Sequence, residues 1–161
     1  MSKEEKKTML AVIRIRGTVG FYYKIKETLD MLNIRRKNYM TIIPNTPSYM
    51  GMLKRAKDTI TYGEINLETL TYLLEKRGEL RGKQRLTDEY IKENSEYKSI
   101  EEFAKAVYEG KAKLSDVPGL KKFFRLHPPR KGFKSVKRGY NEGGDLGYRG
   151  EAINELIVRM A

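Results

Sequence analysis

The sequence contains no cysteine, no tryptophan and one histidine among its 161 residues. The missing cysteines exclude disulfides, iron–sulfur clusters and thiolate zinc sites, and a lone histidine provides neither a metal cluster nor a Cys/His pair. No apolar run approaches the ~20 residues that a membrane-spanning helix needs. The opening segment MSKEEKKTM has no apolar core of a secretion signal. These absences predict a reducing, cytoplasmic setting without a membrane partner.

Charge is what the sequence has in excess. Charged residues make up 34% of the chain and hydrophobic residues 39%, against ~25% and ~45–50% in typical domains. The formal net charge is +12 and the sequence pI about 9.7. Such an imbalance produces self-repulsion in the folded state, which a polyanionic partner would relieve.

The charge is distributed unevenly along the chain. Residues 1–62 carry 13 basic and 5 acidic groups, residues 63–120 carry 10 and 12, and residues 121–161 carry 10 and 4. Two basic segments therefore flank a non-basic one. This pattern predicts that the two ends share a surface facing a polyanion, whereas the middle segment has another role.

The strongest local feature is the stretch KKFFRLHPPRKGFKSVKRGY, residues 121–140. It contains eight Lys or Arg and no Asp or Glu. Two prolines and two glycines prevent it from forming the face of one long helix. Phe and Tyr between cations offer stacking surfaces to unpaired bases, and an irregular basic segment can follow a folded RNA. The alternative is a disordered arm with incidental charge.

The first 62 residues predict the order β-α-β-α-β. Strands are expected over residues 9–16, 39–43 and 59–62, and helices over residues 21–32 and 48–57. In the first strand, the face of Met9, Ala11, Ile13 and Ile15 is predicted to be core. The stripe of the first helix is expected to comprise Tyr22, Ile25, Leu29 and Leu32, and the cations of residues 35–37 suit the negative end of its dipole. Thr46 is a plausible cap and Pro47 a first helical residue. This gives an α+β, ferredoxin-like fold: a small sheet with two helices on one face.

The remaining residues predict further helices. Asn66 can cap a helix over residues 67–76, residues 87–94 can form a short helix, and a capping box at residues 99–102 opens another, which Gly110 closes. A last helix, residues 151–160, is expected to bury Ile153, Leu156, Ile157 and Met160. The expected organisation is a flexible tail (1–8), a core (9–62), a helical extension (63–120), and a basic loop with a C-terminal helix that packs on the core (121–161).

Little in the sequence points to catalysis. His127 is more typical of a hydrogen-bonding or stacking residue, and the acids of the middle helices fit solvated faces. The turn Gly17-Thr18-Val19-Gly20 has the position of a phosphate-binding loop but not the P-loop spacing. Acylphosphatases resemble this opening, with Arg14 or Arg16 and Asn38 in the catalytic roles, although their fuller signature is missing. That hydrolase is the alternative to a non-catalytic protein without cofactor, metal or small-molecule substrate.

Three basic clusters lie outside the predicted buried stripes: Arg14/Arg16 with the glycine turn, residues 35–38, and residues 54–57. The first two lie at opposite ends of the predicted first helix, so they are not expected to form one patch unless the nucleic acid spans the domain. RNA is favoured over DNA because no element looks like a helix that reads the major groove.

The sequence resembles one family, the large-subunit ribosomal proteins called L-thirty in bacteria and archaea and L-seven in eukaryotes. The resemblance is carried by VIRIRGTVG (12–20), LNIRRKN (32–38), PNTP (44–47) and GMLK (51–54), which span the core of the short bacterial form. FRLHPPRKG (124–132) and EGGD (142–145) with the final helix are similar to the longer archaeal and eukaryotic form. The long basic N-terminal extension of eukaryotic members is missing, which points to the archaeal type.

The resemblance implies an antiparallel sheet embedded against large-subunit ribosomal RNA, a structural role without catalysis, and neighbouring ribosomal proteins as partners. The residue chemistry and the resemblance together predict these RNA contacts: Arg14, Arg16, Gly17, Thr18, Arg35, Arg36, Lys37, Asn38, Tyr49, Gly51, Lys54, Lys57, His127, Arg130, Lys131, Lys134, Lys137 and Arg138.

Overall fold

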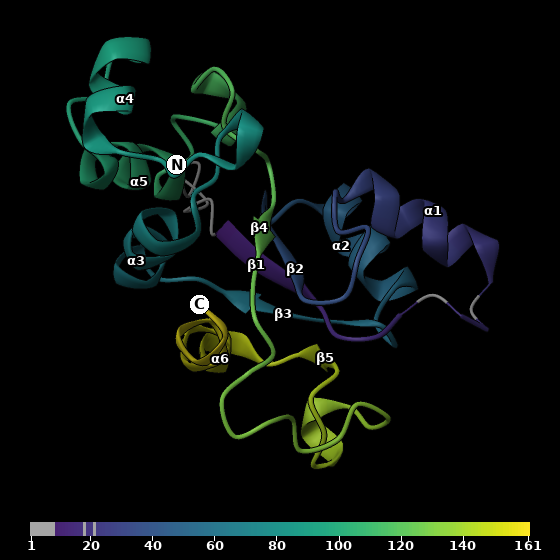
Figure 1. Cartoon of the computed structure of the whole chain (residues 1–161). Helices are drawn as coiled ribbons and strands as arrows, with labels where there is room; N and C mark the ends of the chain where they lie inside the picture. Colours follow the sequence, from purple (N-terminus) through teal and green to yellow (C-terminus); the bar gives the residue numbers. More distant parts are fainter. Residues whose placement is uncertain (1–8, 18, 21) are drawn as a thin grey trace, which may run out of the picture.

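A computed structural model describes residues 9–17, 19–20 and 22–161 (Figure 1). Thr18, Phe21 and the predicted tail lie outside the described residues. The helices and strands are β1 (Met9–Arg14), α1 (Tyr23–Met31), β2 (Tyr39–Pro44), α2 (Pro47–Arg55), β3 (Ile60–Glu64), α3 (Leu67–Arg77), α4 (Asp88–Asn94), α5 (Ile100–Tyr108), β4 (Phe124–Arg125), β5 (Gly147–Tyr148) and α6 (Ile153–Met160). Short 3₁₀ turns η1 (Arg81–Lys83), η2 (Leu114–Asp116), η3 (Tyr140–Glu142) and η4 (Gly150–Ala152) connect them.

The predicted β-α-β-α-β unit and the α+β class are confirmed. β1 lies between β2 and β3 and pairs antiparallel with both, with Val12 opposite Thr41 on one side and Tyr62 on the other. The sheet has five strands in the order β4-β2-β1-β3-β5, because two strands come from the C-terminal segment. β4 pairs antiparallel with β2, and β5 pairs parallel with β3, so the sheet is mixed. Both added strands have two residues, too short for any periodic signal.

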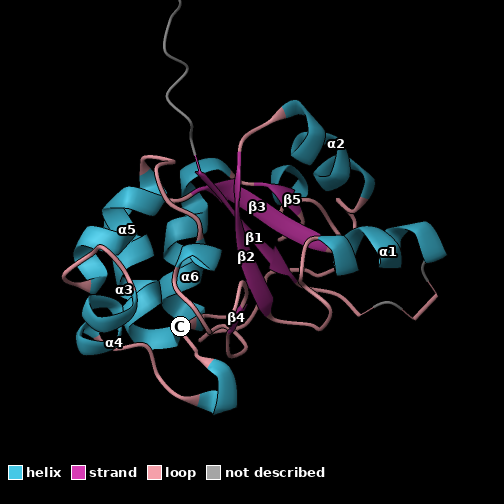
Figure 2. Cartoon of the chain, turned by 90° about the horizontal axis from the view of Figure 1, so that it is seen from above, coloured by secondary structure: helices cyan, strands magenta, loops and turns pink. Residues whose placement is uncertain are grey.

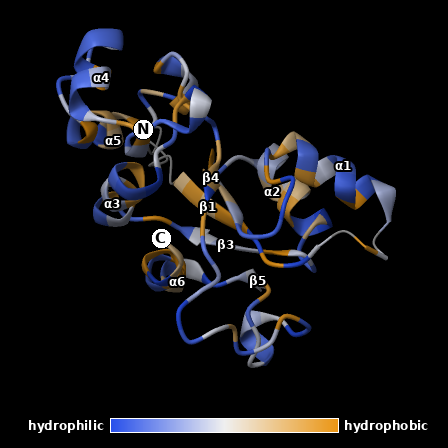
Figure 3. Ribbon diagram, in the orientation of Figure 1, coloured by the Kyte–Doolittle hydropathy of each residue, from blue (hydrophilic) through white to orange (hydrophobic). Residues whose placement is uncertain are grey.

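Both faces of the sheet are covered, and each has its own core (Figure 2). Met9, Ala11 and Ile13 belong to the larger core with α3, α5 and α6, as predicted. Leu10 and Val12 belong to the smaller core with α1 and α2. The predicted core face is therefore confirmed, and the opposite face belongs to a core as well. Because β1 is buried on both faces, its first five residues, 9–13, are all apolar, and most of β1 has the hydrophobic colour in Figure 3.

Helix starts follow the predicted caps. The Thr46 hydroxyl accepts from the N–H of Tyr49, with Pro47 at the first helical position, and the Asn66 side chain accepts from the N–H of Thr69 at 2.7 Å. Ser99 caps α5 through the N–H of Glu102 at 3.3 Å. The second bond of the predicted capping box differs, because the Glu102 carboxylate accepts from the N–H of Lys98.

Two expectations about α1 were wrong. Tyr22 precedes the helix and is 58% exposed, so it is not part of the buried stripe. The helix ends at Met31, four residues before the first cation of residues 35–37, and its last turn holds no basic residue. Because the dipole effect fades within the last turn, these cations do not stabilise α1.

The C-terminal helix is the element predicted best. Ile153, Leu156, Ile157 and Met160 of α6 are all buried in the larger core, beside residues of α3 and α5. Within the described residues, no helix is both long enough and apolar enough to cross a membrane.

Candidate nucleic-acid interface

Three loops that carry cationic side chains lie together at one end of the sheet. Since β1 runs antiparallel to both neighbours, its last residue lies beside the first residues of β2 and β3. The carbonyl of Arg14 accepts from the N–H of Asn38 at 2.8 Å. On the other side, the N–H groups of Ile15 and Arg16 donate to the carbonyl of Thr59 at 2.9 and 3.1 Å. The first two clusters are therefore adjacent, and the prediction that they lie apart was wrong.

We call this region the strand-end surface. It comprises Arg16 and Gly17 after β1, residues 35–38 before β2, and residues 57–59 before β3. Arg35, Arg36, Lys37 and Lys57 are exposed, whereas Arg16 and Asn38 are half-buried. Asn38 has a left-handed backbone (φ 67), and its buried Oδ1 has no hydrogen-bond partner among the described residues. The remaining candidates, Tyr49, Gly51 and Lys54, lie on α2.

Arg14 holds the strand-end surface together and is not exposed on it. Its side chain is buried, donating from Nη1 to the carbonyl of Ile34 at 3.0 Å and from Nε to the carbonyl of Arg16 at 2.9 Å. Burial lowers the pKa of Arg14, and the charge of Asp30 partly opposes this. Burial contradicts the predicted role of Arg14 as a direct RNA contact; the residue instead fixes the two loops that carry the exposed cations.

The C-terminal basic loop begins and ends at the same end of the sheet. β4 is paired so that Arg125 lies opposite Tyr39, the first residue of β2, and Leu126 N–H donates to the carbonyl of Asn38 at 3.1 Å. β5 is paired so that Gly147 lies opposite Thr61, near the start of β3. The basic loop, residues 126–146, thus starts beside one part of the strand-end surface and returns beside another.

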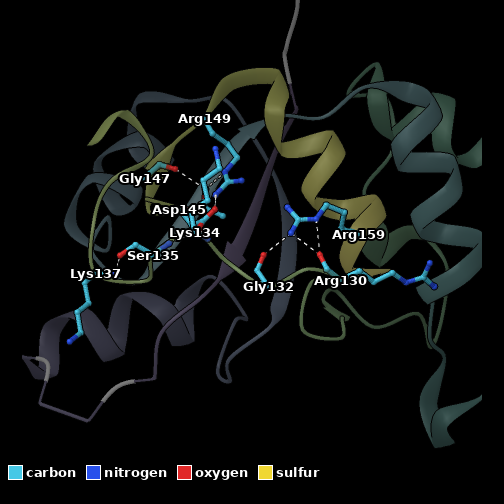
Figure 4. Close-up of polar contacts among 10 residues, drawn as sticks. Arg130, Gly132, Lys134, Ser135, Lys137, Asp145, Gly147, Arg149 and Arg159 are labelled. Atoms are coloured by element: carbon cyan, nitrogen blue, oxygen red, sulfur yellow. Dashed lines mark hydrogen bonds and ion pairs between the residues drawn. The ribbon is translucent and has the colours of Figure 1, made fainter. Parts of the chain in front are cut away.

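A buried ion pair folds the basic loop (Figure 4). The carboxylate of Asp145 accepts from the backbone N–H groups of Lys134 and Ser135 at 2.5 and 3.1 Å. Arg149 donates from Nη2 to Asp145 at 3.1 Å and from Nε to the hydroxyl of Thr61 at 2.8 Å. Both side chains are buried. Sequence reasoning missed this pair. The one available signal was an Asp and an Arg four residues apart inside the glycine-rich segment.

A second arginine fixes the start of the basic loop. Arg159 on α6 donates to the carbonyl of Arg130 at 3.0 and 2.7 Å and to the carbonyl of Gly132 at 2.6 Å. Figure 4 shows the Arg130 carbonyl turned toward Arg159 while its guanidinium extends away. The backbone is therefore held inside, and the predicted contacts of this loop are exposed: His127, Arg130, Lys131, Lys134, Lys137 and Arg138.

The aromatic residues of residues 121–140 are mostly not free to stack on bases. Phe124 is fully buried, Phe133 packs against the larger core, and Phe123 stacks on Tyr39 with ring centroids 5.0 Å apart. Tyr140 is 38% exposed and contacts the Arg149 guanidinium. The expectation of base-stacking Phe residues was wrong, because these rings anchor the basic loop to the fold.

Part of the charge in residues 121–140 is neutralised by an acid distant in sequence. Glu79, just after α3, pairs with Lys121 at 3.1 Å and with Arg125 at 2.5 Å. Burial would raise the pKa of Glu79, but hydrogen bonds from Arg125 and Lys121 outweigh it and lower that pKa. The acid-free stretch is therefore not wholly uncompensated.

The depressed pKa makes stability depend on pH. A carboxylate whose folded-state pKa lies below its unfolded value adds stability above the unfolded pKa, and this is lost as pH falls through the folded pKa. Replacing Glu79 with Gln is expected to lower the unfolding free energy at pH 7 by about 1–3 kcal/mol. The gap between variant and parent should close below about pH 4. Urea denaturation of both proteins from pH 3 to 7 measures this difference in unfolding free energy. A difference that does not change with pH would contradict the lowered pKa of Glu79.

The geometry defines a class of protein: an α+β scaffold whose exposed cationic loops gather at one end, with its one histidine on the surface. Among the described residues, no three His, Asp or Glu side chains are placed to hold a metal ion. The family model of ribosomal protein L30p/L7e matches residues 10–60.

Relatives extend the match to nearly the whole chain. A large ribosomal subunit protein uL30 of Archaeoglobus fulgidus is 58% identical over 152 residues, which cover 94% of this chain and 99% of the relative. Those of Methanosphaera stadtmanae and Methanopyrus kandleri are 52% and 51% identical over 94% and 91% of this chain and 99% of each relative. The chain belongs to the uL30 family of ribosomal proteins. This is a family of structural proteins, so the acylphosphatase alternative was wrong.

Proposed function

We propose that this protein is a structural constituent of the large ribosomal subunit in the cytoplasm and binds ribosomal RNA through the strand-end surface and the basic loop. Family membership supports the ribosomal role. The observation that carries the RNA contact is the convergence of four segments, far apart in sequence, at one end of the sheet.

The chemistry of these segments suits RNA phosphates. Arg offers a planar fork that binds phosphate oxygens in pairs, and Lys acts as a point charge. Hydrogen bonds to the side chains of Asp145 and Arg159 hold the backbone of the basic loop, and hydrogen bonds from Arg14 hold the backbone at Arg16 and Ile34. The exposed cations are thus presented on an ordered surface, which reduces the entropy lost on binding.

Salt dependence tests this proposal directly. Affinity for a large-subunit rRNA transcript should fall steeply with salt, with a log–log slope near −0.7 to −0.9 for each phosphate neutralised. Filter binding between 50 and 300 mM KCl measures the slope, with a tRNA as the competitor for non-specific binding. A log–log slope near zero would contradict the proposed RNA binding.

Gly51 offers a test that separates binding from stability. It lies exposed inside α2, and a Cβ built there meets nothing within 4 Å. Ala should therefore stabilise α2 by about 0.5–1 kcal/mol. If RNA approaches this backbone closely, Gly51→Ala should raise the thermal midpoint and weaken RNA binding. A variant that gains stability and binds RNA normally would remove Gly51 from the interface.

The middle segment is the proposed contact with neighbouring ribosomal proteins. Its helices expose acidic side chains such as Glu89, Glu93 and Glu101, which have no role on an RNA-facing surface.

A further inference from the structure

The middle segment contains a cationic hairpin that its overall composition conceals. Residues 76–85, KRGELRGKQR, hold five basic residues and one acid, although residues 63–120 hold more acids than bases. A bridge between Glu79 and Arg85 closes the hairpin, and Leu80 N–H donates to the Gln84 carbonyl at 2.7 Å. Gly82 and Lys83 turn the chain with φ values of 78° and 61°.

The hairpin and the basic loop line one cavity of about 280 Å³. Its basic lining residues are Arg77, Lys83, Arg85, Arg125 and His127. Among the described residues that line it, Glu79 is the one acid, and it already pairs with Lys121 and Arg125. Among its described lining residues, the cavity therefore holds more positive than negative charge.

Arg77, which lines this cavity, has an unsatisfied hydrogen-bond donor within the described part of the chain. Its Nε is buried and has no hydrogen-bond partner among the described residues. Burial, and then the nearby charge of Arg85, lower the pKa of Arg77. Buried polar groups in native proteins are nearly always hydrogen-bonded. An anion in the cavity would screen the repulsion between Arg77 and Arg85.

We propose that this cavity and the exposed cations of hairpin 76–85 around it bind backbone phosphates of RNA, as an additional RNA contact beside the basic loop. This inference rests on the proposed rRNA binding. We favour an RNA backbone over an acidic protein segment because His127 lines the cavity and the exposed Arg130 and Lys131 follow it three and four residues later in the basic loop. One phosphate chain can therefore follow both, and clustered arginines suit its paired oxygens.

Charge removal at the hairpin tests the proposal. The double variant Lys83→Gln, Arg85→Gln should bind an rRNA transcript more weakly, and its salt slope should be smaller by about 1.5, the value for two phosphate contacts. Because Arg85 also donates to the carbonyl of Lys76, Lys83→Gln alone is measured as well, with an expected slope change of about 0.8. The matched control, Lys92→Gln with Lys98→Gln, removes two exposed charges of the same segment outside the cavity.

The outcomes separate this inference from the proposed function. If the parent binds RNA with a steep salt slope and the hairpin variants match the control, the inference fails and the proposed function stands. If the parent does not bind, the proposed function fails. Competition with inorganic phosphate and with polyglutamate identifies the anion. Displacement by polyglutamate of hairpin-dependent binding, at concentrations where the control is unaffected, would instead indicate an acidic protein partner and overturn the proposal.

A second measurement does not depend on affinity. Because the chain has no cysteine, Gln84→Cys on the exposed hairpin provides a unique attachment point for an iron chelate. Hydroxyl radicals generated there should cleave bound rRNA at a discrete site. Lys98→Cys serves as the control, with no cleavage expected. Absence of cleavage from position 84 in a saturated complex would contradict the contact.

Discussion

Replacing Asp145 with Asn is expected to lower the unfolding free energy by about 3–5 kcal/mol, the usual cost of breaking a buried ion pair. One side of its carboxylate accepts two backbone N–H groups and the other faces Arg149. An amide in this position must direct its NH₂ toward one set of donors, so either orientation places donor against donor. The charge of Arg149 would also remain buried without its partner.

The loss should be localised to the basic loop. Relative to the parent, Asp145→Asn should accelerate hydrogen exchange more at the amides of Lys134 and Ser135 than at the amides of β1. Urea denaturation measures the total loss of unfolding free energy. Glu142→Gln is the matched control: this acid lies in the same segment but is exposed, so a change within about 0.5 kcal/mol is expected. A similar small change for Asp145→Asn, with protection retained, would show that the pair does not organise the loop.

Replacing Arg35, Arg36 and Lys37 together with Ala is expected to reduce the salt slope of rRNA binding by about 2–3 and to leave the thermal midpoint nearly unchanged. All three side chains are exposed, and α1 ends before them. Their charges therefore neither fill the core nor cap the helix.

The control for this variant is the triple replacement of Lys92, Lys98 and Lys111 with Ala. It removes the same charge from exposed positions of the middle segment, so equal losses in both variants would mean that only net charge matters. A fall of more than a few degrees in the midpoint of the first triple variant would mean instead that these residues support the fold.

The β-α-β-α-β core was predictable because its signals are local. Alternation marks a strand, and a side-chain acceptor such as Thr46 or Asn66 marks a helix start within three residues of the bond it makes. The final helix was equally clear, since its four apolar residues repeat at helical spacing and all four are buried. Each of these features depends on neighbours along the chain.

The candidate site was predictable in residue type but not in arrangement. Sequence identified most of the exposed cations, yet it treated Arg14 as one of them and separated it from residues 35–38. Only strand pairing shows that these residues are adjacent and that Arg14 is buried between them. The averaged charge of residues 63–120 likewise concealed the hairpin that lies beside His127.

By itself, the sequence determined the class of fold, the family, and a chain whose net charge of +12 favours a polyanion. The tertiary structure decided which charges are available and which are already paired, as Glu79 pairs with Arg125 across 46 residues of chain. The physical reason is the distance along the chain over which each interaction acts. Backbone propensity and capping act over a few residues, whereas burial and ion pairing depend on contacts that form only when distant segments meet.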